Sequence, residues 1–152
     1  MTRPVLVLMR PLPFPSLRAN DQEIEIRQFQ GDLRVFEGAT VVCSIALDVL
    51  DSSFFAAMPD SVKLIANLGA GFDNIDLVAA TEKGIRVTNT PVVAEDTADL
   101  TFLLILASAR QLTASQSFLR AGLWNSTQPA TRLGKSIHGT TLGIVGFGEI
   151  GQ

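Results

Sequence analysis

Cysteine, histidine and tryptophan each occur once in these 152 residues, and tyrosine does not occur. A lone cysteine excludes an internal disulfide framework and fits a reducing compartment. Cys43 lies in the apolar run TVVCSI, which predicts a buried free thiol. The lone histidine, His138, lies in a polar connection, where we expect it to be exposed and inert. The sequence predicts no metal site.

Charged residues are also few, at 18% of the chain against 47% hydrophobic residues, so a sizeable core can form. The net charge of −3 argues against nucleic acid or an anionic membrane as the main partner. The longest apolar run, residues 102–107, is far shorter than the roughly 20 residues that span a bilayer. The apolar stretch near the N-terminus is too short for the core of a signal peptide. We therefore expect a soluble, cytoplasmic protein with no membrane partner.

Six short β-rich runs alternate with helix-like runs, which indicates an α/β layered sheet. Most are continuous apolar runs, typical of parallel strands that are covered on both faces. The run 23–29 instead alternates, which suggests a strand with one wet face near an edge. The predicted strands are residues 4–9, 23–29, 40–45, 62–68, 85–89 and 141–145. Residues 50–58 and 76–84 are predicted as short helices, the second with Asp76 at its N-cap and Gly84 just past its end.

One long helical pattern covers residues 92–121. Glu95 and Asp96 lie near its start, where acidic side chains favour the helix dipole, and Arg110 suits the end of a helix. Its middle, LTFLLILASA, is apolar nearly all the way round. Such a helix is usually buried on every side, so we expect it to pack between two domains or two subunits.

A GxGxxG pattern, formed by Gly146, Gly148 and Gly151, follows the last predicted strand. The first glycine permits a tight turn, the second lets the backbone approach a pyrophosphate, and the third lets helix and strand pack closely. The helix and the acidic residue about 20 positions later that complete the motif lie outside the sequence. The pattern predicts a dinucleotide site, with an ordinary strand and turn as the alternative. Because the strand before it needs neighbours on both sides, we expect the chain to be truncated.

A second glycine-containing loop, Gly69-Ala70-Gly71, follows the predicted strand 62–68. Glycines at the carboxyl end of a strand leave backbone N–H groups accessible, and loops at that edge bind ligands in α/β sheets. The amides of Ala70 and Gly71 could hold a small carboxylate. The alternative is that these glycines only turn the chain out of the strand. The nearby acids Asp73 and Asp76 are interpreted as turn and capping residues.

Four segments carry a family resemblance, in this order: NLGAGFDNIDLVAATEKGIRVTNTP, AEDTADLTFLLILASAR, AGLW and TLGIVGFGEIGQ. Together they resemble the D-isomer-specific 2-hydroxyacid dehydrogenases, which include glyoxylate/hydroxypyruvate reductases and phosphoglycerate dehydrogenase. The resemblance runs from about residue 64 to residue 152 and is weaker in the first strands. It implies a flavodoxin-like parallel-sheet substrate domain over residues 1–91. Residues 92–152 would then hold a long crossover helix and the first strand of a Rossmann domain that binds NAD or NADP.

The resemblance also implies a substrate loop. Leu68, Gly69, Ala70 and Gly71 would hold the carboxylate of a small 2-oxo or 2-hydroxy acid through backbone amides. Ala70 would also lie near the nicotinamide end of the cofactor, and Thr97 would lie close to the cofactor.

The cofactor motif is implied in the same way. Its residues would be Gly146, Gly148, Glu149, Ile150 and Gly151, with the backbone of Glu149 and Ile150 meeting the pyrophosphate. Many relatives have arginine where this chain has Glu149, which leaves the choice between NAD and NADP open. The stretch from Val92 to Trp124 resembles the arm through which these enzymes dimerise, so a homodimer is expected.

The residues that carry out catalysis in the family, an arginine, an acidic residue and a histidine, come after the glycine motif. No catalytic residue is assigned in this chain, and neither His138 nor Arg110 is proposed for the role. We therefore expect an NAD(P)-dependent oxidoreductase of small D-2-hydroxy acids whose present fragment is inactive by itself. Two alternatives remain: a non-catalytic, dinucleotide-sensing binding protein on the same scaffold, or an inactive remnant that only dimerises.

Overall fold

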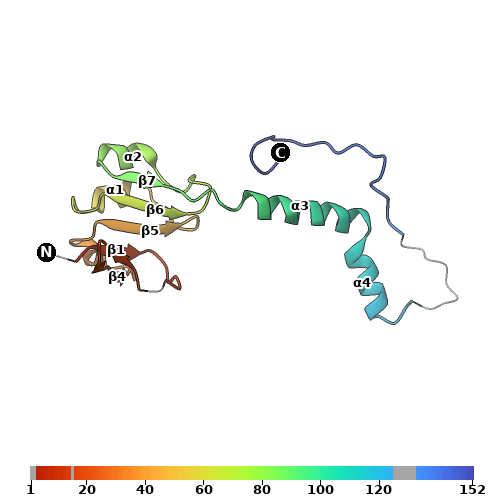
Figure 1. The fold of residues 1–152 in the computed structure, drawn as a ribbon, viewed down its shortest axis with the longest axis horizontal. Coiled ribbons are helices and arrows are strands. Elements are labelled where there is room, and N and C mark those ends of the chain that lie inside the picture. Colours follow the sequence, from red (N-terminus) through yellow and green to blue (C-terminus); the bar gives the residue numbers. More distant parts are fainter. Residues whose placement is uncertain (1–2, 15, 125–132) are drawn as a thin grey trace. The chain divides into compact units, whose positions relative to one another are not determined.

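The computed structural model describes residues 3–14, 16–124 and 133–152, which form two compact units, unit 1 (Met1–Pro91) and unit 2 (Val92–Gln152) (Figure 1). Unit 1 contains a sheet of five strands in the order β4-β1-β5-β6-β7, and every neighbouring pair is parallel. The strands are β1 Val5–Leu8, β4 Glu25–Gln28, β5 Val41–Ile45, β6 Leu64–Leu68 and β7 Arg86–Thr88. Numbered along the chain, their order is 2-1-3-4-5, which is that of flavodoxin-like folds. The predicted fold class is therefore confirmed for this unit.

The first five predicted runs each contain one of these strands, with ends that differ by at most two residues. The alternating run 23–29 holds β4, which lies at the edge of the sheet as expected. Its first residue, Glu23, belongs instead to a small antiparallel hairpin formed by β2 Arg18–Ala19 and β3 Gln22–Glu23. Asn20 and Asp21 turn this hairpin with positive φ angles, a conformation that these two residue types tolerate better than most.

A row of aliphatic side chains crosses the sheet and forms the centre of the core. Val7 pairs with Val42, Val42 with Ile65, and Ile65 with Val87 in successive strands. Val7, Val42 and Ile65 have no exposed surface. Because side chains alternate between the faces of a strand, in-register pairing places this row on one face. That face is covered by the 3₁₀ turn η1 (Leu33–Phe36) and by two helices, α1 (Ser52–Ala57) and α2 (Leu77–Glu82), whose buried residues join the same cluster.

Two short helices lie between the later strands, α1 Ser52–Ala57 and α2 Leu77–Glu82. Asp51 caps α1 by accepting from the N–H of Phe54 at 2.9 Å. Hydrogen bonds from the Ser53 hydroxyl and the Phe54 N–H hold the pKa of the Asp51 carboxyl below its usual range. Asp76 caps α2 in the same way, and Gly84 follows its end with a φ of 70°, so both predicted helix signals are confirmed.

The prediction for the cysteine is also confirmed. Cys43 is a free, buried residue of β5 with 4% of its surface exposed. Burial, with a smaller contribution from the negative charge of Asp48, raises the pKa of the thiol. Because the thiolate is the reactive form, Cys43 is an inert packing residue at neutral pH.

Unit 2 corrects the prediction of a single helix over residues 92–121. The chain forms α3 Ala94–Ala109 and α4 Leu112–Arg120, separated at Gln111, which has a left-handed backbone with φ 53° and ψ 39°. Residues 133–135 meet the chain at this break: the Lys135 N–H donates to the Ala109 carbonyl at 2.7 Å. The last carbonyls of a helix have no partner within it, and this hydrogen bond supplies one for the Ala109 carbonyl at the end of α3. Glu95 and Asp96 do lie in the first turn of α3, and Arg110 is its C-cap.

The apolar surface of α3 is exposed within the single chain. No residue of this helix is buried, and four of its large apolar side chains, Leu100, Phe102, Leu103 and Leu104, are each more than half exposed. The expectation that the helix is covered on every side is therefore not met by the described residues of one chain. In the part of the chain that the structure describes, no helix is long and apolar enough to cross a membrane.

The predicted strand at residues 141–145 does not form. These residues have no regular secondary structure, and Val145 is fully exposed. A parallel strand exists only when a neighbour accepts and donates its backbone hydrogen bonds. None of the described strands pairs with this segment, so its strand-like composition has no effect on its conformation. The predicted polar connection before it lies partly in residues 125–132, outside the described residues.

Candidate functional site

The loop that follows β6 is tied to the segment that follows β7. Gly69 donates its N–H to the Thr90 hydroxyl at 2.8 Å, and the Thr90 N–H donates to the Gly69 carbonyl at 2.9 Å. Gly69 has a φ of 154°, in a region that glycine occupies far more readily than other residues. β6 and β7 are parallel neighbours, so their carboxyl ends lie at the same edge of the sheet. This double contact therefore anchors the start of the loop at that edge.

The carbonyl groups of all three loop residues accept hydrogen bonds from the protein. The Gly69 carbonyl accepts from the Thr90 N–H, and the Ala70 carbonyl accepts from the side-chain amide of Asn89 at 2.7 Å. The Gly71 carbonyl accepts from the side-chain amide of Asn67 at 2.9 Å. The negative ends of the three peptide dipoles are thus turned toward protein donors.

The N–H groups of Ala70 and Gly71 are left available. A trans peptide points its C=O and N–H in opposite directions, and this chain has no cis peptide in its described part. Holding the Gly69 and Ala70 carbonyls against Thr90 and Asn89 therefore aims the next two N–H groups away from them. Neither N–H donates to any acceptor among residues 3–14, 16–124 and 133–152, and both residues are exposed. Two adjacent free N–H groups at a sheet edge can bind an anion such as a carboxylate.

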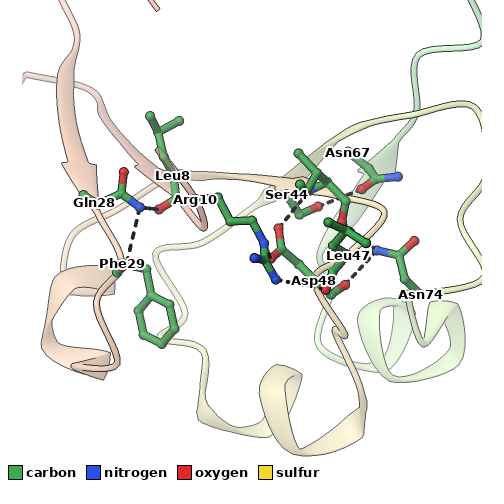
Figure 2. Close-up of polar contacts among 10 residues, drawn as sticks. Leu8, Arg10, Gln28, Phe29, Ser44, Leu47, Asp48, Asn67 and Asn74 are labelled. Carbon is green, nitrogen blue, oxygen red and sulfur yellow. Dashed lines mark hydrogen bonds and ion pairs between the residues drawn. The ribbon is translucent and has the colours of Figure 1, made fainter. Parts of the chain in front are cut away.

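Asn67 holds the last residue of the loop, Gly71, from within the sheet. It lies in β6 with 1% of its surface exposed, and its side-chain oxygen accepts from the hydroxyl of the equally buried Ser44 in β5 at 3.0 Å (Figure 2). Since the Gly71 carbonyl can only accept, it must face the nitrogen end of the amide, and the oxygen end then faces the Ser44 hydroxyl. A buried polar pair between two central strands thus orients the end of the loop.

An ion pair joins the carboxyl ends of β1 and β5. Arg10 Nε donates to Asp48 Oδ1 at 2.6 Å, and the Arg10 guanidinium also donates to the Leu47 carbonyl at 3.2 Å (Figure 2). Asp48 is 6% exposed, and its second oxygen accepts from the Ile45 N–H at 2.9 Å. The strand order reverses between β1 and β5, which is the point where open α/β sheets commonly bind ligands. Here Arg10 and Asp48 bridge that point.

Asn74 connects the two parts of this edge. Its side-chain amide donates to the carbonyl of Asp48 at 2.8 Å and to that of Ile45 at 3.2 Å. Asn74 follows the glycine loop by three residues, so the loops after β5 and β6 are held to each other. Ala46 reaches to 4.0 Å from the place that a Cβ on Gly69 would occupy.

We expect Asp48→Ala to destabilise unit 1 by about 1–3 kcal/mol, because the substitution leaves the partly buried Ile45 N–H without its acceptor. Arg10 contributes little to this loss, since its side chain is 48% exposed and can be solvated. Asp48→Asn, which keeps an oxygen acceptor, serves as the matched variant and should lose less. Urea unfolding followed by far-UV circular dichroism measures both. Equal unfolding midpoints for wild type and Asp48→Ala would contradict this reading of the network.

The glycine motif in unit 2 forms a turn without its strand or helix. Gly146 has a φ of 88°, and the N–H groups of Gly151 and Gln152 both donate to the Gly148 carbonyl at 3.1 Å. A Cβ on Gly151 would stand 2.5 Å from the Gly146 carbonyl oxygen, so the third glycine is required for close approach within the turn. The N–H groups of Glu149 and Ile150 donate to no acceptor in the described parts of the chain. Both N–H groups are therefore available to an external acceptor.

The other residues considered from the sequence lie as follows. Thr97 lies in the first turn of α3, where its hydroxyl donates to the Val93 carbonyl at 2.7 Å. His138 is exposed, as expected. Trp124 is 64% exposed. The substrate loop belongs to unit 1, whereas Thr97 and the glycine motif belong to unit 2.

Sequence reasoning missed the residues that hold the loop, Asn67, Asn89 and Thr90, and the ion pair of Arg10 and Asp48 at the same edge of the sheet. The contacts that Asn89 and Thr90 make with the loop span 19 and 21 residues, and the ion pair spans 38. Hydrophobic periodicity and local spacing carry no information on such pairs. The one available signal is position, because each of these residues lies at or just after the end of a predicted strand.

The fold and the loop define an α/β protein with two available N–H groups, those of Ala70 and Gly71, at the carboxyl edge of a parallel sheet. The sequence profile of the family "D-isomer specific 2-hydroxyacid dehydrogenase, catalytic domain" matches residues 5–142. The chain therefore belongs to the D-isomer-specific 2-hydroxyacid dehydrogenase family, a family of oxidoreductases.

Comparison with individual relatives supports this family assignment. The chain is 35% identical to a glyoxylate reductase of Thermococcus litoralis, over 99% of this chain and 49% of the relative. Among solved structures it is similar to D-lactate dehydrogenase from Aquifex aeolicus, which was solved with NAD and lactic acid. The TM-score is 0.81 and the identity 28%, and the match covers 97% of this chain and 45% of that one. It is also similar to an NADPH-dependent glyoxylate/hydroxypyruvate reductase from Sinorhizobium meliloti in complex with NADP and malonate. Here the TM-score is 0.73 and the identity 26%, and the match covers 99% of this chain and 48% of that one. The chain spans about half the length of the curated relatives it matches.

Proposed function

We propose that this chain is the substrate-binding part of an NAD(P)-dependent oxidoreductase that acts on the CH–OH group of a small D-2-hydroxy acid, or reduces the matching 2-oxo acid. One observation carries the proposal. The carbonyls of Gly69, Ala70 and Gly71 all face protein donors, which leaves the N–H groups of Ala70 and Gly71 for a carboxylate. Family membership supplies the reaction class, and the relatives solved with lactic acid and malonate bind molecules that carry such a carboxylate.

In this proposal residues 1–91 are the substrate domain, and residues 92–152 are the crossover and the beginning of the cofactor domain. The loop from Leu68 to Gly71 holds the substrate carboxylate, with Ala70 also facing the nicotinamide end. Thr97 at the start of α3 lies near the cofactor.

The glycine turn is proposed to hold the cofactor pyrophosphate. Its residues are Gly146, Gly148, Glu149, Ile150 and Gly151. The free N–H groups of Glu149 and Ile150 support this assignment. The Glu149 carboxylate adds negative charge and no donor, so the backbone alone would meet the phosphates. The bound cofactor, NAD or NADP, supplies or accepts a hydride at its nicotinamide. Glu149 does not decide between the two.

The described residues bind and orient substrate rather than transfer protons. The exposed His138 and the helix-capping Arg110 belong to unit 2, and neither has a role in the substrate loop. We therefore propose that the present chain has no turnover by itself. Measurable oxidation of NADH or NADPH with glyoxylate by this chain would place catalytic groups within it and contradict the assignment.

We further propose that the chain forms a homodimer through the stretch from Val92 to Trp124 and acts in the cytoplasm. The support for the dimer is the exposed apolar surface of α3, since contiguous exposed apolar surface of this kind marks interaction sites. The lone reduced cysteine supports the compartment.

Titration of the ¹⁵N-labelled chain with oxamate, an analogue of a 2-oxo acid, tests the proposed substrate loop. We expect the amide resonances of Ala70 and Gly71 to move most, because a hydrogen bond to a carboxylate changes the shielding of the donor. Acetamide, which lacks the carboxylate, is the matched control and should leave both resonances in place. Shifts that spare Ala70 and Gly71, or equal shifts with acetamide, would rule out the loop as the carboxylate site.

A further inference from the structure

We propose that Asn89 is a positioning residue that holds the Ala70–Gly71 peptide in the orientation needed for anion binding. This inference rests on the proposed carboxylate site and adds a residue to it. Asn89 comes directly after β7, and its side-chain amide donates to the Ala70 carbonyl at 2.7 Å across 19 residues. It touches the peptide from the carbonyl side, opposite to the N–H that would meet the ligand.

The peptide that Asn89 holds is the least constrained one in the loop. The Gly69 carbonyl is held by a backbone N–H, that of Thr90, and Gly69 itself is fixed on both sides. The Gly71 carbonyl is held by the buried Asn67. The Ala70 carbonyl has only the exposed side chain of Asn89 as its partner among the described residues.

Glycine at position 71 makes this peptide able to rotate. A Cβ built on Gly71 would meet nothing within 4 Å, so the space around it is open, and glycine adopts φ angles of either sign. If the peptide turns over, its carbonyl takes the place of the Gly71 N–H. The loop then presents a negative oxygen to the carboxylate instead of a donor. The Asn89 hydrogen bond favours the binding orientation over this reversed one.

Asn89 suits a test because its loss leaves no cavity. Its side chain is exposed, so Asn89→Ala removes the donor without emptying the core. Asn89→Asp keeps the shape of the side chain, but its ionised carboxylate cannot donate. Gln30→Ala is the matched control, since Gln30 is an exposed amide residue of the same unit and is not in contact with the loop.

Two measurements on the ¹³C,¹⁵N-labelled chain test the proposal. The two-bond scalar coupling between the Gly71 nitrogen and the Ala70 Cα depends on the ψ angle of Ala70, which changes when this peptide turns over, so it reports the orientation of the peptide without any ligand. Oxamate titration reports affinity. For Asn89→Ala we expect an altered or averaged Gly71 coupling. We also expect oxamate affinity to fall about tenfold, as for the loss of one charge-assisted hydrogen bond. Asn89→Asp should alter the same coupling, while Gln30→Ala should change neither reading.

The inference is overturned if Asn89→Ala keeps the wild-type Gly71 coupling. A weaker oxamate affinity together with an unchanged coupling and a lower unfolding midpoint would assign Asn89 a purely structural role and would also overturn it. If the wild-type chain binds no oxamate at the loop, the proposed function fails. The couplings then still decide whether Asn89 orients the peptide.

Discussion

Phe36→Ala is expected to lower the free energy of unfolding of unit 1 by about 3–5 kcal/mol, among the largest effects of any single substitution in the chain. Phe36 has no exposed surface and lies at the end of the 3₁₀ turn between β4 and β5. Its ring centroid lies 5.3 Å from that of Phe29 and 6.0 Å from that of Phe54, the second pair meeting edge to face. Truncation therefore removes an aromatic contact on each side and leaves a cavity that the neighbouring rings only partly fill.

Leu33→Ala is the matched control for this substitution. Leu33 begins the same turn but is 51% exposed, so its truncation should change stability by less than about 0.5 kcal/mol. Far-UV circular dichroism in urea is the suitable probe, because the only tryptophan, Trp124, lies in unit 2 and does not report on unit 1. Similar losses for the two variants would mean that Phe36 is not the centre of the core.

Replacing Leu103 and Leu104 together with glutamate is expected to convert the proposed dimer to monomer. Both side chains lie in the middle of α3 and are more than half exposed in the single chain. A symmetric dimer contains each residue twice, so each substitution acts at two places. If each buried leucine contributes about 1.5 kcal/mol, the four substituted positions of the dimer weaken association by about 6 kcal/mol, or roughly 10⁴-fold. Glutamate is a good helix former, so α3 itself should persist.

Sedimentation velocity over a range of protein concentrations measures this effect. Val78→Glu is the matched control: Val78 is an exposed apolar residue of α2 in unit 1, and its exchange introduces the same charge elsewhere. The control should sediment like the wild type. A wild-type chain that is monomeric at every concentration, or a double variant that still dimerises, would remove the case for α3 as the interface.

Much of unit 1 could be predicted from the sequence because its signals are local. β-rich runs located five strands, and the alternation at residues 23–29 identified the edge strand. Asp76 and Gly84 marked the ends of α2, since capping and left-handed turns depend on residue type at one position. The glycine loop after β6 was also found in this way.

The predictions that were wrong or incomplete all concern contacts with residues far along the chain, which a local sequence pattern does not contain. Residues 141–145 have the composition of a strand but no described neighbour to complete their hydrogen bonds. The helix predicted over residues 92–121 is interrupted at Gln111, which has a left-handed backbone, and at this break the N–H of Lys135, 26 positions beyond Ala109, donates to the Ala109 carbonyl. The residues that orient the substrate loop went unnoticed for the same reason.

By itself, the sequence determined a parallel α/β sheet, a glycine loop at its carboxyl edge and membership of a dehydrogenase family, because each of these follows from local residue type or from ordered motifs. The tertiary structure alone decided which way the loop peptides face. Three donors from two segments, on Asn67 in β6 and on the adjacent Asn89 and Thr90 after β7, hold the three carbonyls. A planar trans peptide then directs the N–H groups of Ala70 and Gly71 away from those donors, toward the place where a carboxylate can bind.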